Sequence, residues 1–325
     1  MITFLTVVHH RDLPLLMLQA KSMDQFVDRK IVSKILVVIN DQKEHRLRLE
    51  LERILPNYGS LSGIVSVLSG DDVLAKGWAG LHGLKSRYIN RLQVHRHRGW
   101  RGNNGYRIQQ AIKLAAGRIS PTEQIVILDA KNLFVSPVCE TDFFDPENKP
   151  LTSFQPVVEG IHKDWLDESL KVLSINKSKM NIFETTKFVT PFSVTKEILN
   201  SVCREVEAKN GALEVMFASR KRPSEFMLIN AWAIENFGGV RNIFGQERRR
   251  HVGYWPDGGN ERFLELLNAM VDPNTLTVSV HYKALQHLSK QDRDGFALAL
   301  EKKKLGSREE VISLLNDADC RSSKT

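Results

Sequence analysis

Asp129 is the residue whose position most strongly suggests chemistry. It closes an apolar run, residues 125–128, in the stretch EQIVILDAKNLFVSPV, residues 123–138, and Lys131 follows two residues later. Such a run is typical of a fully buried strand, and open α/β sheets bind ligands at the carboxyl ends of their strands. A carboxylate at that point can hold a cation or a hydroxyl group. It can equally cap a turn onto Lys131 or Asn132, and the sequence leaves both interpretations open.

One hypothesis is a degenerate D-x-D motif, Asp129-Ala130-Lys131. Nucleotide-sugar glycosyltransferases of the GT-A type end a buried strand with two spaced carboxylates, which hold Mg²⁺ or Mn²⁺ against the donor's diphosphate. Here Lys131 stands in the place of the second carboxylate. A lysine can neutralise a phosphate oxygen as a point charge. A divalent cation, Mn or Mg, bound by Asp129 and His281, is therefore a candidate cofactor whose role Lys131 could take over.

The alternative hypothesis is a nuclease of the D/E-x-K type. Its strand carries an acid and a lysine two residues apart, and hence on one face, with another acid upstream that shares the metal. Asp129 and Lys131 fit this local pattern, but Glu123 lies at the start of the same strand and Asp71 and Asp72 lie far upstream. Because two fixed residues occur often by chance, the match is weak.

Polar residues also follow two other strand-like segments. His281 ends the β-branched run TLTVSV, with Lys283 two residues on, and both are candidates for binding the donor diphosphate. His9, with its neighbour His10, and Asp12 follow the first segment, ITFLTVV, and are donor-site candidates by topology alone. A satisfied structural histidine is the competing interpretation of His281.

Segments of strand and helix character alternate along the first third of the chain. The strand-like segments are ITFLTVV, KILVVIN and GIVSVLS; between them lie the helical patterns DLPLLMLQAKSMDQF and EHRLRLELERIL. This alternation predicts a parallel sheet with helices on both faces. We expect residues 70–105, rich in glycine and basic residues, to form an irregular segment, followed by a helix over YRIQQAIKLAAGRI.

Composition fits a folded globular protein, and its basic charge favours either an anionic partner or simply a solvated basic surface. The 325 residues are 42% hydrophobic and 26% charged, and the net charge is +8. The basic runs 95–98, 220–222 and 248–251 lack the basic–aromatic interleaving of a nucleic-acid surface, so no nucleic acid is expected as partner. The N-terminal segment lacks the features of a secretory signal. The predicted localisation is cytoplasmic, with peripheral contact at the inner, anionic membrane face as an open option.

The stretch from residue 99 to 138 resembles the bacterial GT-A-like glycosyltransferases of the DUF6492 type. These have an aromatic–glycine approach, a helix with QQ and KL, a strand ending LDAD or LDSD, and then a phenylalanine and PV. The matching positions are Trp100, Gln109, Gln110, Lys113, Leu114, Leu128, Asp129, Phe134, Pro137 and Val138. Looser matches at the first strand and at Ser224, Glu225 and Asn230 extend the resemblance over about residues 1–285.

The resemblance implies a role for each matching polar residue. Asp129 would face the donor ribose or diphosphate, directly or through a cation. Gln110 and Lys113, three residues apart, would lie on one helix face, and a plain helix surface is the competing interpretation of both. Trp100 and Tyr106, which flank a Gly/Asn loop, would stack on a base or sugar; an aromatic loop that packs onto the domain is the competing interpretation. Glu225 would bind the acceptor hydroxyl or act as its general base, although an acid at a helix start is also favoured by the helix dipole.

Together these features predict a GT-A-like glycosyltransferase of α/β class. The fold would be a Rossmann-like, mixed and mainly parallel sheet flanked by helices, residues 1–285, with a helical C-terminal extension, residues 286–325. The partners would be a nucleotide-sugar donor and a glycan or lipid-linked acceptor. A non-catalytic relative that binds sugar nucleotides or glycans is the alternative outside the enzymes, because the second acid is missing.

Overall fold

The fold is that of a computed structural model, which describes residues 1–75, 81–98, 105–176, 182–219 and 223–323. Within these residues, the main sheet has five strands in the order β3-β2-β1-β4-β9. A second sheet contains β11, β12 and β5, and two short pairs complete the set. The strands are β1 Ile2–Val8, β2 Val32–Ile39, β3 Val65–Ser69, β4 Gln124–Asp129, β5 Asn132–Phe134, β6 Leu151–Thr152, β7 Phe154–Pro156, β8 Glu184–Thr186, β9 Phe192–Thr195, β10 Gly245–Gln246, β11 Arg250–Tyr254 and β12 Thr275–Val280.

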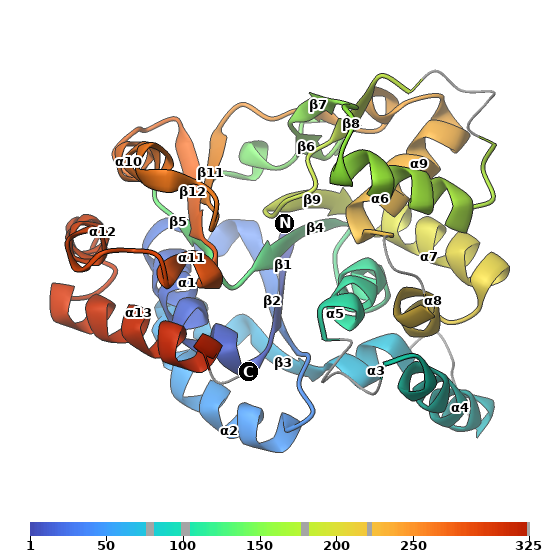
Figure 1. The fold of residues 1–325 in the computed structure, drawn as a ribbon, viewed down its shortest axis with the longest axis horizontal. Helices are drawn as coiled ribbons and strands as arrows, with labels where there is room; N and C mark the ends of the chain where they lie inside the picture. Colours follow the sequence, from blue (N-terminus) through green and yellow to red (C-terminus); the bar gives the residue numbers. More distant parts are fainter. Residues whose placement is uncertain (76–80, 99–104, 177–181, 220–222, 324–325) are drawn as a thin grey trace.

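Helices cover both faces of the main sheet (Figure 1). They are α1 Leu13–Phe26, α2 Glu44–Ile54, α3 Gly70–Ala75, α4 Leu81–Arg98, α5 Gly105–Leu114, α6 Ile161–Val172, α7 Lys196–Asn210, α8 Leu213–Ser219, α9 Glu225–Phe237, α10 Gly259–Ala269, α11 Tyr282–Leu285, α12 Lys290–Lys302 and α13 Arg308–Ser323. None of the described helices combines the length and the apolar character needed to cross a bilayer.

The predicted fold class is confirmed. Strands β1 to β4 pair in parallel, and β9 runs antiparallel to β4 at the edge, so the sheet is mixed and mainly parallel. Successive β1 residues belong to different cores: Phe4 belongs to the core that includes residues of α1 and α13, and Leu5 belongs to the core that includes residues of α5, α7 and α9. This two-sided burial explains why the strands read as continuous apolar runs.

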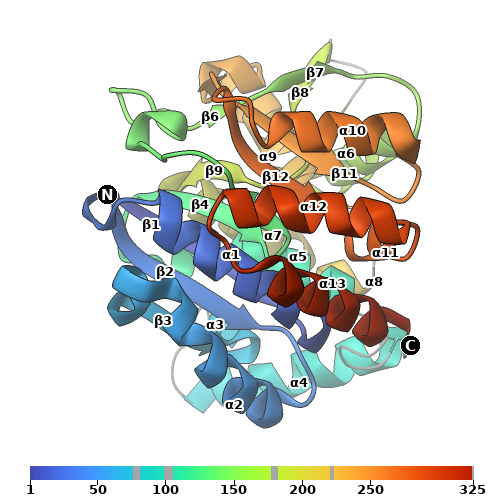
Figure 2. The same ribbon diagram turned by 90° about the vertical axis from the view of Figure 1, so that its left-hand side faces the viewer.

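The predicted helical extension after residue 285 is present as α12 and α13. Helix α13 packs against α1, and α12 packs against α13 (Figure 2). Val311 and Leu315 of α13 join the same hydrophobic core as Leu16 of α1. The division into a domain of residues 1–285 and an extension of residues 286–325 stays a prediction.

The prediction of an irregular segment over residues 70–105 is wrong for its described parts. Helices α3 and α4 occupy much of it. In α4 the buried side chains include Asn90 and Val94, four residues apart, and Asn90 Nδ2 donates to Glu214 Oε1 at 3.1 Å. A helix that buries so narrow a stripe gives a weak apolar period in the sequence, which is why the pattern did not reveal it.

A buried polar cluster beside the second sheet gives the fold a pH dependence. Lys187 Nζ donates to Glu247 Oε2, and His251 Nε2 lies 3.4 Å from the same oxygen. Burial, together with the positive charge of Lys187, lowers the pKa of His251 to about 4. The folded protein therefore keeps this imidazole neutral in a pH range where the unfolded chain protonates it.

We expect acidification to destabilise the protein through His251. Its pKa is lower in the folded state, so its contribution to stability is lost as the pH falls from about 6.5 to about 4. Over that range the unfolding free energy of the wild type should drop by about 2–3 kcal/mol more than that of His251→Gln. Urea denaturation at several pH values measures this difference. Parallel curves for the two proteins would contradict the assignment.

Candidate active site

The turn at residues 129–132 joins the main sheet to the second sheet, and two side-chain amides fix it. Asn132 Oδ1 accepts from the Asp129 backbone N at 2.7 Å, and its Nδ2 donates to the Thr190 carbonyl at 3.1 Å. Gln19 Nε2 donates to the carbonyls of Asp129 (2.7 Å) and Asn132 (3.2 Å). Both amides are buried. The direction of the Asp129 side chain is therefore set by the backbone beneath it.

The Asp129 carboxylate stands between two lysines. Its Oδ1 lies 2.7 Å from Lys113 Nζ and its Oδ2 lies 3.2 Å from Lys131 Nζ. Burial alone would raise the pKa of Asp129, but the two positive charges hold it well below its usual range. Since 21% of this side chain remains exposed, the ionised carboxylate still borders solvent.

Lys113 connects Asp129 with Glu225, because its position on α5 brings its ammonium group to both carboxylates. Lys113 Nζ lies 3.4 Å from Glu225 Oε1, and burial, which would lower its pKa, is outweighed by the two carboxylates, which raise it above its usual range. Gln110, one turn earlier on α5, donates to Glu225 Oε2 at 3.2 Å and to the Pro223 carbonyl at 3.0 Å when its amide nitrogen faces them. Gln110 and Lys113 therefore share a face, and that face is buried rather than helix surface.

Lys131 lies against a row of stacked rings. Its Nζ is 4.5 Å from the centroid of the Trp255 ring, Trp255 stacks on His281 at 5.1 Å, and His281 stacks on Tyr282 at 4.6 Å. The antiparallel register that pairs Ser279 of β12 with Asn132 of β5 brings the end of β12 to this turn. The predicted proximity of His281 to Lys131 thus follows from strand pairing.

His281 is held in place and is neutral near pH 7. Its Nδ1 accepts from the Lys283 backbone N at 3.2 Å and caps α11. Burial, and then the positive charges of Lys131 and Lys283, lower its pKa to about 4. A neutral imidazole can donate or accept one hydrogen bond, but it adds no positive charge for a diphosphate. The Lys283 side chain is exposed beside it.

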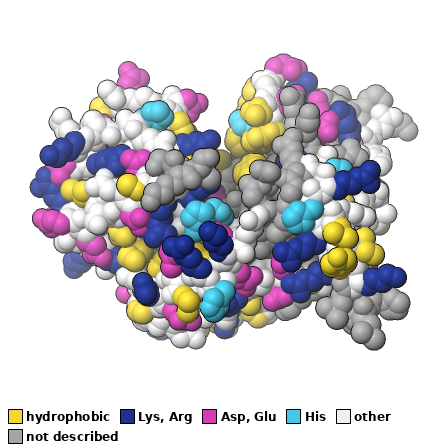
Figure 3. Space-filling model, turned by 60° about the horizontal axis from the view of Figure 1, so that its bottom comes forward, with side chains coloured by type: hydrophobic (Ala, Val, Ile, Leu, Met, Phe, Trp, Pro, Cys, Tyr) yellow, Lys and Arg dark blue, Asp and Glu magenta, His cyan; other side chains and the backbone are white. Residues whose placement is uncertain are grey.

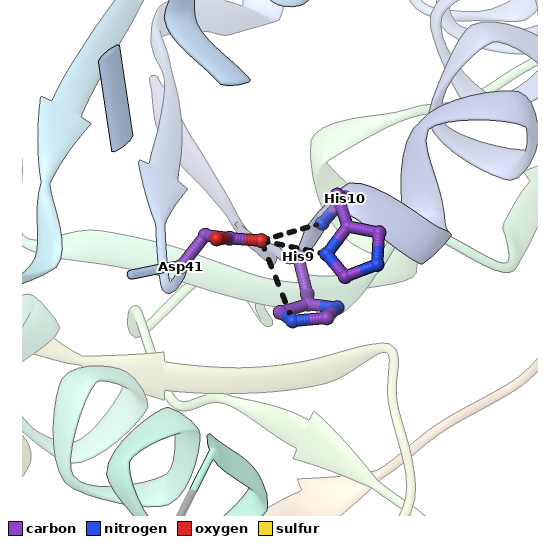
Figure 4. Close-up of side chains that lie close together, drawn as sticks. All are labelled: His9, His10 and Asp41. Atoms are coloured by element: carbon purple, nitrogen blue, oxygen red, sulfur yellow. Dashed lines mark hydrogen bonds and ion pairs between the residues drawn. The ribbon is translucent and has the colours of Figure 1, made fainter. Parts of the chain in front are cut away.

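The end of β1 contributes Asp12, His9 and His10 to the same sheet edge, because Val7 of β1 pairs with Asp129 of β4. Asp12 Oδ2 accepts from the His9 backbone N at 2.8 Å. Burial raises the pKa of Asp12 to about 6, and the negative charge of Asp129 adds to that rise. His9 turns toward Asp41, which follows β2 (Figure 4). On the face in Figure 3, Lys, Arg and His side chains gather near the middle.

Of the two aromatic candidates before α5, one is described. Tyr106 is 67% exposed at the start of α5; local desolvation and the negative charge of Glu225 raise the pKa of its hydroxyl to about 12. It therefore lies near the carboxylates as a neutral phenol with an open ring. Trp100 lies outside the described residues.

The structure brings Asp129, Lys113, Glu225, Gln110 and Lys131 into direct contact with one another in one cluster. Next to this cluster lie His281, Lys283, Asp12 and Tyr106, while His9 turns toward Asp41 on β2.

Sequence reasoning missed three residues of this edge. The Trp255 ring lies next to the Lys131 ammonium group, and Gln19 donates a hydrogen bond to the Asp129 carbonyl. The Asp41 carboxylate is hydrogen-bonded to the His10 ring. Asp41 could have been found, because it comes two residues after the end of β2, much as Asp129 ends β4. Gln19 sits in the middle of a helix, where the sequence carries no sign of its role.

The Asp129 carboxylate is a poor match for a divalent cation. Both of its oxygens already lie within ion-pairing distance of a lysine, so a cation would have to approach two ammonium groups. Hard cations such as Mg²⁺ and Mn²⁺ require several oxygen ligands, and the adjacent position is Lys131 rather than an acid. A cation shared by Asp129 and His281 stays a prediction that this charge arrangement disfavours.

Comparison with known proteins gives one family. The sequence model of a family described as "Family of unknown function (DUF6492)" matches residues 6–249. No curated protein matches the chain.

Among solved structures, the chain is similar to the galactosyltransferase LgtC in complex with donor and acceptor sugar analogues. That match has 11% identity and a TM-score of 0.47, and it covers 96% of this chain and 95% of LgtC. It is also similar to mouse xyloside xylosyltransferase 1, at 11% identity and a TM-score of 0.38, covering 81% of this chain and 91% of the mouse protein.

Removal of the shared lysine should destabilise the fold. Lys113→Met leaves the carboxylates of Asp129 and Glu225 buried without their common cation, at an expected cost of about 3–5 kcal/mol. Chemical denaturation measures the loss. The control is Lys30→Met, at an exposed lysine remote from the cluster, which should change stability by less than about 0.5 kcal/mol. Equal stability of the two variants would contradict the central role of Lys113.

Proposed function

The protein belongs to the DUF6492 family, and we propose that it is a glycosyltransferase. In this proposal it moves a sugar from a nucleotide-sugar donor to a glycan or lipid-linked acceptor, without needing a metal ion at Asp129. The observation that carries the proposal is the Asp129 carboxylate at the sheet edge, flanked by Lys113 and Lys131 and bordered by the Trp255 ring.

This arrangement offers one group for each part of such a donor. Lys131 Nζ, the outer of the two ammonium groups with 17% of its side chain exposed, would pair with the diphosphate. Asp129 would accept hydrogen bonds from sugar or ribose hydroxyls, and it orients Lys131. Trp255, 39% exposed, would cover a sugar or base face. Lys283 and His281 would support the diphosphate from the other side.

Lys131 would also do the electrostatic work that a cation does in a D-x-D site. Negative charge develops on the diphosphate as the glycosidic bond breaks, and a fixed ammonium group stabilises it without reorganisation. Glu225 is proposed as the group that binds the acceptor hydroxyl or acts as its general base if the enzyme inverts. For this, the carboxylate must meet the acceptor through its exposed 7%.

A non-catalytic binding protein is the second candidate, and the placement of Glu225 favours it. That carboxylate is almost fully buried and lies 3.4 Å from Lys113, so it could serve only to position the lysine. A D/E-x-K nuclease has less support. Its lysine would act beside a metal-bound water, whereas Lys131 lies against Asp129 itself.

The sharpest test converts the motif back into D-x-D. The wild type should be stabilised in thermal-shift assays by one member of a panel of UDP-, GDP- and CMP-sugars, equally with EDTA or Mn²⁺, and should hydrolyse or transfer it. Lys131→Asp should lose metal-free donor binding by about 10-fold or more, since the ammonium group is gone, and should regain binding only with Mn²⁺. Lys30→Gln is the matched control. Donor binding without turnover would favour the non-catalytic alternative.

A basic, partly apolar helix supports peripheral contact with an anionic membrane. On α4, Tyr88 (67% exposed), Ile89 (41%) and Leu92 (52%) are exposed, and the nearby Lys85 and Arg96 are exposed as well. Apolar side chains flanked by cations suit the interface of anionic lipids. The net charge of +8 acts in the same direction. We place the protein on the cytoplasmic side of the membrane, where a lipid-linked acceptor would be presented.

We therefore expect the protein to sediment with vesicles that contain phosphatidylglycerol, and not with pure phosphatidylcholine vesicles. The double variant Tyr88→Ser/Leu92→Ser should reduce the bound fraction at least about 5-fold, because it removes apolar area that would enter the interface. Leu49→Ser, at a leucine 50% exposed on α2, is the control and should bind as the wild type does. Unchanged binding of the double variant would exclude α4 as the contact.

A further inference from the structure

A second cluster at the sheet edge has the composition of a transition-metal site. His9 and His10 follow β1 and Asp41 follows β2; the three offer ligand atoms that all lie within 4.8 Å of one another. His10 Nδ1 lies 2.9 Å from Asp41 Oδ2, and His9 Nε2 lies 3.3 Å from that same oxygen (Figure 4). Within the described part of the chain, this is the one group of three His, Cys, Asp or Glu side chains so arranged.

The spacing matches the edges of a coordination polyhedron. Zinc binds histidine nitrogen and carboxylate oxygen at about 2.0–2.2 Å, which places neighbouring ligand atoms of a tetrahedral or octahedral site about 3.0–3.5 Å apart. The two nitrogen–oxygen distances in the cluster, 2.9 and 3.3 Å, fall close to that range. Small shifts of the side chains would thus admit an ion.

The backbone around the cluster is already fixed. Asp41 Oδ1 accepts from the Lys43 backbone N at 2.8 Å, and Oδ2 accepts from the His10 backbone N at 3.2 Å. Arg321 of α13 donates to the His10 carbonyl at 3.0 Å, so the C-terminal extension holds the loop. Groups that fix the ligands in this way raise metal affinity, because less order has to be gained on binding.

The chemistry of the set selects the metal and leaves room for another ligand. Two imidazoles and one carboxylate suit Zn²⁺, Co²⁺ or Fe²⁺ far better than Mg²⁺ or Ca²⁺, which prefer oxygen. The carboxylate is 6% exposed, whereas the His9 and His10 side chains are 34% and 48% exposed. The buried Asp41 carboxylate would hold the ion on its protein side, and the exposed histidines would leave its solvent side open to water or to a substrate oxygen.

We propose that His9, His10 and Asp41 bind one divalent transition-metal ion at the carboxyl ends of β1 and β2. This site is separate from Asp129 and does not depend on the proposed glycosyl transfer. All three ligand residues lie within two residues of the carboxyl end of a strand of the main sheet.

Metal binding to the untagged, full-length protein tests the proposal. Calorimetric titration with Zn²⁺ should show one site per chain, and Co²⁺ should give the visible absorption of a nitrogen- and oxygen-ligated ion. His10→Ala and the isosteric Asp41→Asn should each weaken Zn²⁺ binding by about 10-fold or more. His287→Ala, at an exposed histidine outside the cluster, should bind as the wild type does.

Two results would overturn the site: no stoichiometric binding by the wild type, or unchanged binding by both ligand variants. Circular dichroism checks that each variant is folded, and Asp41→Asn keeps the volume of the side chain if His10→Ala does not fold. Because the readout is metal binding, its failure leaves the glycosyltransferase proposal standing. The failure of donor binding would likewise leave the metal site standing.

Discussion

The ion pair between Lys113 and Asp129 is the interaction on which the candidate site depends. Asp129 ends β4, and its main chain is held by hydrogen bonds with Asn132 and Gln19, so its side chain starts from a fixed point at the edge of the sheet. A buried carboxylate needs a counter-charge, and Lys113 of α5 supplies it. The same ammonium group reaches Glu225 at the start of α9. One lysine thereby ties a strand and two helices together at the point where a ligand would bind.

This charge balance divides the two lysines by role. Lys113 is 7% exposed and satisfied by two carboxylates, so it serves to position them. Lys131 has a single carboxylate partner in the cluster, Asp129, and rests on the face of Trp255, where it keeps access to solvent. Its charge is therefore the one that an incoming anion would meet. The neutral imidazole of His281, which stacks on Trp255, contributes to this surface without adding to its charge.

The sequence predicted the main sheet and the position of Asp129 because both rest on local patterns. Buried strands such as β4 are continuous apolar runs, and a polar residue that ends one must lie at the sheet edge. The helix α4 escaped prediction because its buried stripe includes Asn90 beside Val94, a polar residue whose partner, Glu214, lies far along the chain. Trp255 and Gln19 escaped for a related reason. Their contacts with Lys131 and Asp129 join distant parts of the chain, and no local pattern encodes them.

The two clusters at the sheet edge differ in the groups that contact their carboxylates. At Asp129, protein cations already occupy both carboxylate oxygens, so the site suits an anionic ligand that meets Lys131. At Asp41, the backbone N–H groups of Lys43 and His10 donate to the carboxylate, and the imidazoles of His9 and His10 lie against it. An imidazole can bind a metal through a ring nitrogen that carries no proton. An ammonium group such as that of Lys113 cannot serve as a ligand while it is charged. The presence of Lys131 instead of an acid at the end of β4 thus disfavours a cation there, whereas the proposed site at the ends of β1 and β2 offers a carboxylate and two imidazoles as ligands.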